Sequence, residues 1–245
     1  MSGLTLLPVE GVPEVRPGDD LAACLAPGLE PQDGDIVIVA QKVVSKAEGR
    51  LRRLSEVSPS ARAQELAGRV DGDPRMVQVV LDESVRVVRS ERVLIVETRH
   101  GFVCANAGVD HSNVDGEADV VSLLPEDSDA SAAALRDRLR QLTGRELAVI
   151  VADTFGRPWR AGIVNVALGV AGLAPLVDHR GYPDDQGRIM NATVIAVADE
   201  LASAAELVMG KTRRVPAAVV RGYTPEGAPG TGRELIRPPE QDLFR

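Results

Sequence analysis

The stretch "GDIVIVAQKVVS", residues 34–45, decides the fold class because an unbroken Ile/Val run lies between polar residues. A run of this length is typical of a strand that is buried on both faces of a sheet. The Gly-Asp pair before it is a turn signal, so we expect the strand to begin there. Lys42 and Lys46 follow the run. They would face an anion together if the chain turns helical, and otherwise they are a solvated pair of cations beside a turn.

A second apolar run ends in an acid. The segment "LAVIVADTFGRPWRAG", residues 147–162, places Asp153 and Thr154 directly behind a predicted buried strand, with Arg157 and Arg160 close behind them. An acid and a hydroxyl at such a place can hold a divalent cation. The arginines could bind phosphate or carboxylate oxygens in bidentate geometry. The alternative is an ordinary turn at the end of a strand, because Asp and Thr are favoured in turns.

A third segment adds another acid. "NAGVDHSNV", residues 106–114, places Asp110 and Asn113 three residues apart after another predicted strand. Aspartates at two separate strand-to-loop junctions, Asp110 and Asp153, could share Mg²⁺ or Mn²⁺ and link the ions to nucleotide phosphates. His111 has no second His or Cys at metal-ligand spacing. Zinc is therefore not expected, and this histidine is interpreted as a solvated loop residue.

The remaining pattern mixes strands and helices without a regular βαβ rhythm, which favours a mixed α/β or α+β fold over a doubly wound sheet. We expect one helix with Ser58 as N-cap and a second from Pro74 with Val87 on its apolar face. The chain is expected to form one module, 1–245, in which an inserted subdomain could occupy about 74–187. Further elements are expected as a hairpin over 92–108, a helix over 128–144 closed by Gly144, a strand and helix over 192–210 with Asp199 as cap, and a strand over 216–223.

Composition excludes several classes of function. The net charge is −8 and the pI about 5.0, so the chain lacks the basic surplus that nonspecific nucleic-acid or anionic-membrane binding needs. Only three of its 28 basic residues are lysines. Its longest apolar stretch, 161–177, is interrupted by Asn165 and is too short to span a membrane. Cys24 and Cys104 are interpreted as unlinked thiols of a cytoplasmic protein.

Six segments of the chain occur in an order that is specific to one family. They are "LLPVEGVPEVRPGDDL" (6–21), "DGDIVIVAQKVVSKAEGRLRRL" (33–54), "NAGVDHSNV" (106–114), "ADTFGRPWRAG" (152–162), "VADELASAAELVMG" (197–210) and "PAAVVRG" (216–222). Together they resemble the motifs of the coenzyme F420-0:L-glutamate ligases, also called F420 gamma-glutamyl ligases. The resemblance runs from about Leu6 to about Arg237, which is nearly the whole chain.

This resemblance implies a GTP-dependent ligase. Members of the family attach L-glutamate, one or more residues in gamma linkage, through its amine to the carboxylate tail of a deazaflavin precursor, F420-0, and release GDP and phosphate. The gamma-phosphate of GTP would turn that carboxylate into an acyl phosphate, a reaction that needs no protein nucleophile. The resemblance also implies Mg²⁺ or Mn²⁺, assistance by K⁺, and a homodimer whose subunits have two intertwined α+β subdomains with mixed sheets.

The resemblance assigns roles to individual residues. Asp110, Asp153 and Thr154 would ligate the metal. The segment from Met209 to about Val215 would close over the nucleotide. The nucleotide contacts would come from Val12, Pro13, Glu14, Val15, Gln41, Lys42, Lys46, Asn113, Met209, Gly210 and Lys211.

The chain departs from some relatives at two places. Where those relatives carry a metal-binding glutamate after the late helix, this chain has Lys211. A lysine cannot ligate a cation, but it could neutralise a phosphate directly. Where some members have small hydroxyl residues, this chain has Gln41 and Lys42, so the contact to phosphate would differ there.

Two other functions are compatible with the same residues. A two-metal phosphohydrolase could use these aspartates on a different phosphate ester, and a non-catalytic module could bind deazaflavin or serve for dimerisation. "MGKT", residues 209–212, ends like a P-loop, but Ala205 stands where the first glycine is required. The chain could be a standalone enzyme or the N-terminal module of a fusion with a nitroreductase-like domain.

Overall fold

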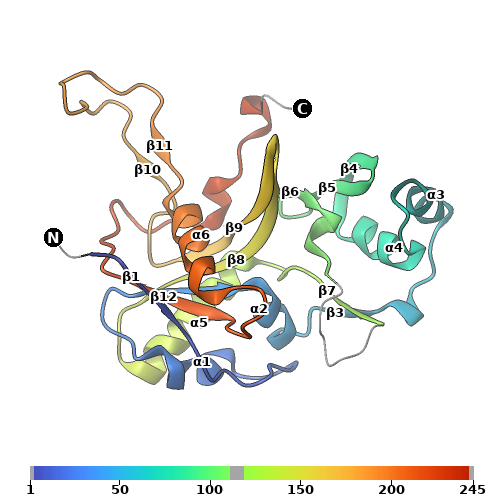
Figure 1. Cartoon of the computed structure of the whole chain (residues 1–245), viewed down its shortest axis with the longest axis horizontal. Coiled ribbons are helices and arrows are strands. Elements are labelled where there is room, and N and C mark those ends of the chain that lie inside the picture. The colour runs from blue at the N-terminus through green and yellow to red at the C-terminus, as the bar shows by residue number, and fades with distance from the viewer. Residues whose placement is uncertain (1–2, 111–118, 243–245) are drawn as a thin grey trace.

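The computed structural model describes residues 3–110 and 119–242, and a mixed five-stranded sheet lies at its centre (Figure 1). β2 and β8 run parallel, whereas the other neighbouring strands are antiparallel. The expected α+β class with mixed sheets is therefore confirmed. In spatial order the strands are β1 (Thr5–Pro8), β12 (Ala217–Arg221), β2 (Ile36–Ala40), β8 (Ala148–Arg157) and β9 (Arg160–Ala171).

The Ile/Val run forms β2 as expected, but the strand is shorter than the quoted stretch. Its first four residues are fully buried. After Ala40 the chain leaves the sheet and forms α2, Gln41–Ala47. The helical turn buries Val44 against the same core. Lys42 and Lys46 therefore lie one helical turn apart, which is the arrangement in which they can face one anion together.

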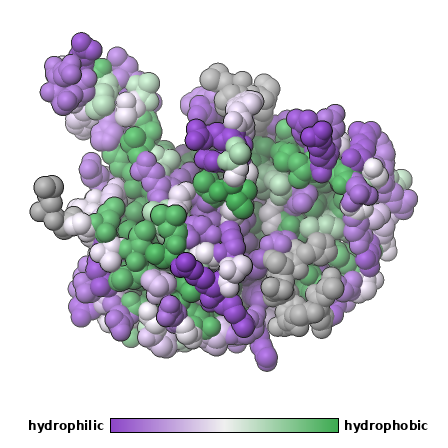
Figure 2. All heavy atoms as spheres, in the orientation of Figure 1, coloured by the Kyte–Doolittle hydropathy of each residue, from purple (hydrophilic) through white to green (hydrophobic). Residues whose placement is uncertain are grey.

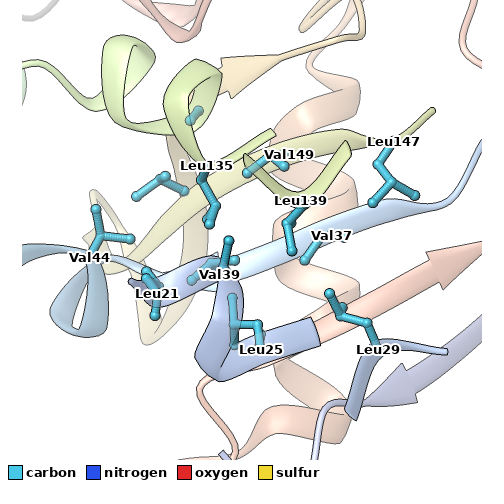
Figure 3. Packing of buried hydrophobic residues seen from close by; sticks show 14 of the residues in the cluster. Leu21, Leu25, Leu29, Val37, Val39, Val44, Leu135, Leu139, Leu147 and Val149 are labelled. Carbon is cyan, nitrogen blue, oxygen red and sulfur yellow. The ribbon is translucent and has the colours of Figure 1, made fainter. Parts of the chain in front are cut away.

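Helices cover both faces of the sheet. On one face α1 (Leu21–Leu29) and α5 (Ser128–Thr143) pack against side chains that include Val37 (Figure 3). On the other face α6 (Val197–Met209) packs against side chains that include Ile38. Successive strand residues point to opposite faces, so β2 contributes to two cores at once. This explains why its apolar run is continuous rather than alternating.

A third apolar cluster lies beside the main sheet and draws on residues 54–123. It forms the right-hand part of Figure 1. An inserted subdomain with boundaries at about 74–187 stays a prediction. The elements of this region are β3 (Leu51–Arg53), α3 (Ala61–Val70), α4 (Pro74–Asp82), β4 (Ser84–Glu91), β5 (Val93–Thr98), β6 (Val103–Ala105) and β7 (Val120–Ser122).

A two-stranded arm of β10 (Val177–Asp178) and β11 (Val194–Ile195) projects from the main body at the upper left of Figure 1. Figure 2 shows mostly hydrophilic residues at its tip. Within residues 3–110 and 119–242, no helix is long and apolar enough to cross a membrane. Four 3-10 helices complete the described chain: η1 (Leu54–Glu56), η2 (Asn106–Gly108), η3 (Gly232–Leu235) and η4 (Pro239–Gln241).

Three local expectations are wrong. α3 is capped by Ser60 rather than Ser58. Val87 lies on β4 and not on the helix from Pro74, because that helix ends before the chain extends at Ser84. Asp199 does not cap α6, since its carboxylate accepts a hydrogen bond from the backbone of β9. In each case several residues suit a cap or an apolar face, and tertiary contacts decide among them.

Other expected elements are confirmed. β5 and β6 form the hairpin predicted within 92–108. α5 ends at Gly144, which adopts a left-handed conformation with φ of 68°. β12 lies within the strand predicted over 216–223. These elements carry strong local signals, namely alternating β-rich runs and a glycine at the helix C-terminus.

Candidate active site at the ends of the parallel strands

A cleft opens where the parallel pairing of β2 with β8 ends, at Ala40 and Ala152. Parallel strands end at the same edge of a sheet, and ligands of open α/β sheets commonly bind there. The cleft has a volume of about 1230 Å³, which is ample for a nucleotide-sized ligand. Its walls come from residues 12–15, α2, residues 105–110, the two strands β8 and β9, α6 and residues 209–216.

The structure brings the predicted site residues together in this cleft. Asn113 lies outside the described residues, as does His111. Segments from the start, the middle and the end of the chain thus share one cavity, while the role of each residue stays a prediction. The predicted residues that line the cleft are Val12, Pro13, Glu14, Val15, Gln41, Lys42, Lys46, Asp110, Asp153, Thr154, Met209, Gly210 and Lys211.

Every lysine of the chain lines this cleft, namely Lys42, Lys46 and Lys211. Nζ of Lys42 donates a hydrogen bond to Oδ2 of Asp110 over 2.6 Å. Nζ of Lys46 donates to Oε1 of Glu14 over 2.5 Å. A lysine ammonium is a compact point charge that suits phosphate recognition. An acidic chain has therefore concentrated its few lysines where an anion can be neutralised.

Glu14 links two walls of the cleft. The hydrogen bond from Lys46, which is only 6% exposed, lowers the pKa of the Glu14 carboxyl. The guanidinium of Arg214 lies 3.4 Å from the other carboxylate oxygen. The segment 12–15 is thereby tied both to α2 and to the segment 209–215, and residues of all three line the cleft.

Backbone contacts hold the acid-bearing segment in place. Asp110 forms an antiparallel bridge with Ser122 of β7. Gln41, the first residue of α2, is buried, and its amide donates to the carbonyl oxygen of Leu123 over 2.9 Å. The segment around β7 therefore connects α2 with the chain at Asp110, and Gln41 has a structural partner although it also lines the cleft.

Asp110 and Asp153 are electrostatically coupled. Burial raises the pKa of Asp153 to about 6, and the negative charge of Asp110 contributes to the increase. The backbone N–H of Thr154 and the ammonium groups of Lys211 and Lys42 act in the opposite direction. Because the pKa of Asp153 is still raised, these three groups offset only part of the effect of burial and of the Asp110 charge.

The donor atoms of this pair suit a hard divalent cation. Two carboxylates and the hydroxyl of Thr154 provide the oxygen ligands that Mg²⁺ and Mn²⁺ prefer. A cation between Asp110 and Asp153 would relieve their repulsion and reverse the effect of burial on the pKa of Asp153. In the described part of the chain, no three His, Cys, Asp or Glu side chains converge as a metal site. The available set is thus two acids and a hydroxyl.

Sequence reasoning missed two polar residues of the cleft, Asn165 and Glu206. Thr154 and Asn165 are partners in the β8–β9 ladder, and the Thr154 hydroxyl donates to Oδ1 of Asn165 over 2.7 Å. Nδ2 of Asn165 donates to Oε2 of Glu206 over 3.0 Å. Lys211 closes a ring through contacts with Oγ1 of Thr154 and, over 3.2 Å, with Oε1 of Glu206. Asn165 could have been recognised from the sequence, because it is the one amide side chain inside the longest apolar stretch. Such a residue needs a hydrogen-bond partner when it is buried.

The prediction for the end of β8 is partly wrong. Asp153 and Thr154 do not follow a strand or form a turn, because β8 continues to Arg157 and returns directly as β9. Neither Arg157 nor Arg160 is among the cleft-lining residues. Arg157 instead donates to the carbonyl oxygen of Ala161 within the hairpin. β8 continues past the end of β2 because β9 pairs with its residues from Asp153 to Arg157. This pairing comes from a later part of the chain and outweighs the local preference of Asp and Thr for a turn.

Comparisons with known proteins point to one family. The family model described as F420-0:Gamma-glutamyl ligase matches residues 11–222. A coenzyme F420:L-glutamate ligase from Methanothermobacter thermautotrophicus is 48% identical over 99% of this chain and 99% of its own length. The protein of the same name from Methanopyrus kandleri is 48% identical over 100% of both chains. That from Archaeoglobus fulgidus is 44% identical over 98% of this chain and 96% of its own.

Proposed function

Because this chain belongs to the family of F420-0:gamma-glutamyl ligases, we propose that it joins the amine of L-glutamate to the carboxylate of F420-0, with any further glutamates in gamma linkage and GTP as phosphoryl donor. One observation supports the nucleotide-dependent mechanism most: all three lysines and the predicted metal-binding aspartates line a single cleft. Phosphoryl transfer needs positioning and charge neutralisation more than a protein nucleophile. The polar groups of the cleft meet that requirement.

The reaction would run in two steps, formation of an acyl phosphate and its reaction with the amine of L-glutamate. In the first, a carboxylate oxygen of F420-0 attacks the gamma-phosphorus of GTP, a new O–P bond forms, and the bond to the beta-phosphate oxygen breaks to release GDP. In the second, the amine of L-glutamate attacks the acyl carbon, phosphate leaves, and the amine loses a proton. The acyl phosphate between the steps must be shielded from water, and the several chain segments that wall the cleft would contribute to this.

Lys42 and Lys46 would bind the phosphates from α2. In the structure their ammonium groups contact the carboxylates of Asp110 and Glu14. Incoming phosphate oxygens would replace or share these contacts, because both acids are partly exposed and such pairs are individually weak. Lys211 would approach from the segment after α6, so cations would surround the triphosphate from two sides.

Asp110, Asp153 and Thr154 would hold Mg²⁺ or Mn²⁺. When bound, the cation would neutralise charge on the phosphate oxygens. Asp153 is the residue on which this depends most, since burial raises its pKa and a bound cation would favour its ionised form. We also expect assistance by K⁺ and a homodimer, which replacement of K⁺ by Na⁺ and light scattering would test.

A product assay tests the proposal. The purified protein is mixed with GTP, Mg²⁺, L-glutamate and F420-0, and the products are weighed by mass spectrometry. We expect the mass of F420-0 to increase by one or more glutamate residues, with one GDP formed for each, and no increase when L-glutamate is omitted. GTP loss without that increase would indicate a phosphohydrolase. Binding of F420-0 without either change would indicate a non-catalytic module.

A further inference from the structure

Thr154, Asn165, Glu206 and Lys211 line the cleft and form a closed ring of polar contacts. We propose that Asn165 and Glu206 are positioning residues that fix the direction of the Thr154 hydroxyl, so that its oxygen can accept a divalent cation. The inference rests on the proposed function, because it concerns the metal that this function requires. Neither residue was among the predicted ligands.

The direction of the ring follows from what each group can donate. An ionised Glu206 only accepts hydrogen bonds, so the Asn165 group that faces it must be the NH₂. The side-chain oxygen Oδ1 of Asn165 therefore faces Thr154, and because an amide oxygen only accepts, the Thr154 hydroxyl must donate across the 2.7 Å between them. Lys211 has only donors, so its contact with Thr154 uses one lone pair of that hydroxyl.

One lone pair of Thr154 is left over by this arrangement. A hydroxyl has one proton and two lone pairs; the proton goes to Asn165 and one lone pair accepts from Lys211. The remaining lone pair of Thr154 is available to a cation, and Thr154 lies next to the predicted metal ligand Asp153. If the ring ran the other way, the Thr154 proton would point outward and oppose cation binding. Asn165 and Glu206 would thus act on the metal without touching it.

The ring is built on a rigid support. Asn165 is 3% exposed, and its backbone carbonyl oxygen accepts a hydrogen bond from the Ser203 hydroxyl over 2.7 Å. Asp199 accepts from the backbone N–H of Ala167 over 2.8 Å. Residues 199, 203 and 206 are spaced by about one helical turn, so they form one face of α6. This face docks α6 onto β9 and holds Glu206 against Asn165.

The test measures Mn²⁺ affinity by electron paramagnetic resonance, without turnover. Asn165→Leu keeps the net charge but removes the acceptor for the Thr154 proton, so we expect Mn²⁺ to bind about tenfold or more weakly. Asn165→Asp keeps that acceptor, so we expect an affinity within about threefold of wild type or tighter. If Asn165 only stabilised the fold, Asn165→Asp would bind Mn²⁺ more weakly than Asn165→Leu. The aspartate would place a second carboxylate beside Glu206, which disrupts the structure more than an apolar side chain does.

A compensating pair gives a second test. In Glu206→Gln the amide can turn Asn165 around and reverse the Thr154 hydroxyl, so we expect weaker Mn²⁺ binding by about tenfold. The double variant Asn165→Asp with Glu206→Gln exchanges carboxylate and amide while it restores the direction of the ring. We expect it to recover the affinity to within about threefold of wild type. Glu200→Gln removes an exposed carboxylate of α6 that does not line the cleft, so it serves as the matched control with unchanged affinity.

The outcomes separate this inference from the proposed function. Thermal unfolding identifies the temperature at which all variants are folded, and affinities are compared there. If the wild type ligates glutamate and binds Mn²⁺ but Asn165→Leu binds Mn²⁺ equally well, or better than Asn165→Asp, the positioning role is overturned and the proposed function stands. If the wild type neither binds Mn²⁺ nor ligates glutamate, the proposed function itself is overturned.

Discussion

Lys42 donates a 2.6 Å hydrogen bond to Asp110, a residue that lies 68 positions further along the chain. The side chains are 32% and 50% exposed, respectively. A cation of α2 and an acid of the segment after η2 therefore meet at the mouth of one cavity. A pair this accessible to water contributes little to stability. It can exchange partners, so that Lys42 binds a phosphate while Asp110 binds a metal.

The first prediction concerns Lys42. Lys42→Gln removes one phosphate-binding charge, so we expect the KM for GTP to rise by about tenfold, the equivalent of about 1.4 kcal/mol, with a much smaller change in kcat. The free energy of unfolding should change by less than about 1 kcal/mol, because the ion pair is exposed. Steady-state kinetics at saturating F420-0 and glutamate measure both constants. Arg145→Gln, which removes an exposed charge paired with Asp33, is the matched control. An unchanged KM for GTP in Lys42→Gln would remove this lysine from the binding site.

The second prediction concerns Asp153. Burial raises its pKa from 3.8 to about 6, so the folded protein without metal holds a proton on this group that the unfolded chain has already lost. Between about pH 4 and pH 6 this group therefore lowers the stability of the wild type as the pH rises. Asp153→Asn lacks that effect. We expect it to be more stable than the wild type by up to about 3 kcal/mol at pH 7.5 and by almost nothing at pH 4.

Urea unfolding in the presence of EDTA at the two pH values measures this difference. Turnover of Asp153→Asn should be almost completely lost, because an amide is a poor ligand for the divalent cation. A variant that is both more stable and inactive would identify Asp153 as a residue kept for function at a cost in stability. A stability difference that does not depend on pH would show that burial of the carboxylate is not its cause.

The third prediction concerns Lys46. Its ammonium group is almost fully buried and lowers the pKa of Glu14. Glu14 therefore stabilises the fold above about pH 4.5, and this contribution of less than about 1 kcal/mol is lost as the pH falls through the lowered pKa. In Lys46→Met we expect the carboxyl pKa of Glu14 to return toward its ordinary value in a ¹³C NMR titration.

GTP binding of the same variant, measured by calorimetry, should weaken at least tenfold, or about 1.4 kcal/mol. Retention of wild-type GTP affinity would exclude Lys46 from phosphate binding.

The sequence predicted the apolar framework better than the site geometry. Runs such as Ile36–Val39 and a glycine such as Gly144 carry their structure locally, and both were confirmed. The end of β8 was misjudged because Asp153 and Thr154 are favoured in turns, while the strand that prevents a turn comes later in the chain. Glu206 was missed for a related reason. A glutamate on a helix is ordinary, and only its distant partner Asn165 makes it part of the cleft.

The fourth prediction concerns a contact that sequence alone does not reveal. A Cβ added at Gly169 on β9 would lie 1.9 Å from the carbonyl oxygen of Ser128, at the start of α5. Backbone atoms must shift to accommodate it, so we expect Gly169→Ala to lower the free energy of unfolding by about 3 kcal/mol. Gly68→Ala is the control, because that glycine lies within α3 and faces open space. There we expect a gain of about 0.5 to 1 kcal/mol from helix propensity and the unfolded chain. Equal effects of the two substitutions in urea unfolding would contradict the tight packing of β9 on α5.

The most direct test of a shared metal and triphosphate site is anomalous diffraction from a crystal soaked with Mn²⁺ and a non-hydrolysable GTP analogue. We predict a Mn²⁺ peak bound by the carboxylates of Asp110 and Asp153, with phosphate oxygens within hydrogen-bond reach of Lys42 and Lys46. A peak at some other place, or phosphates bound away from α2 while the two aspartates point apart, would contradict it.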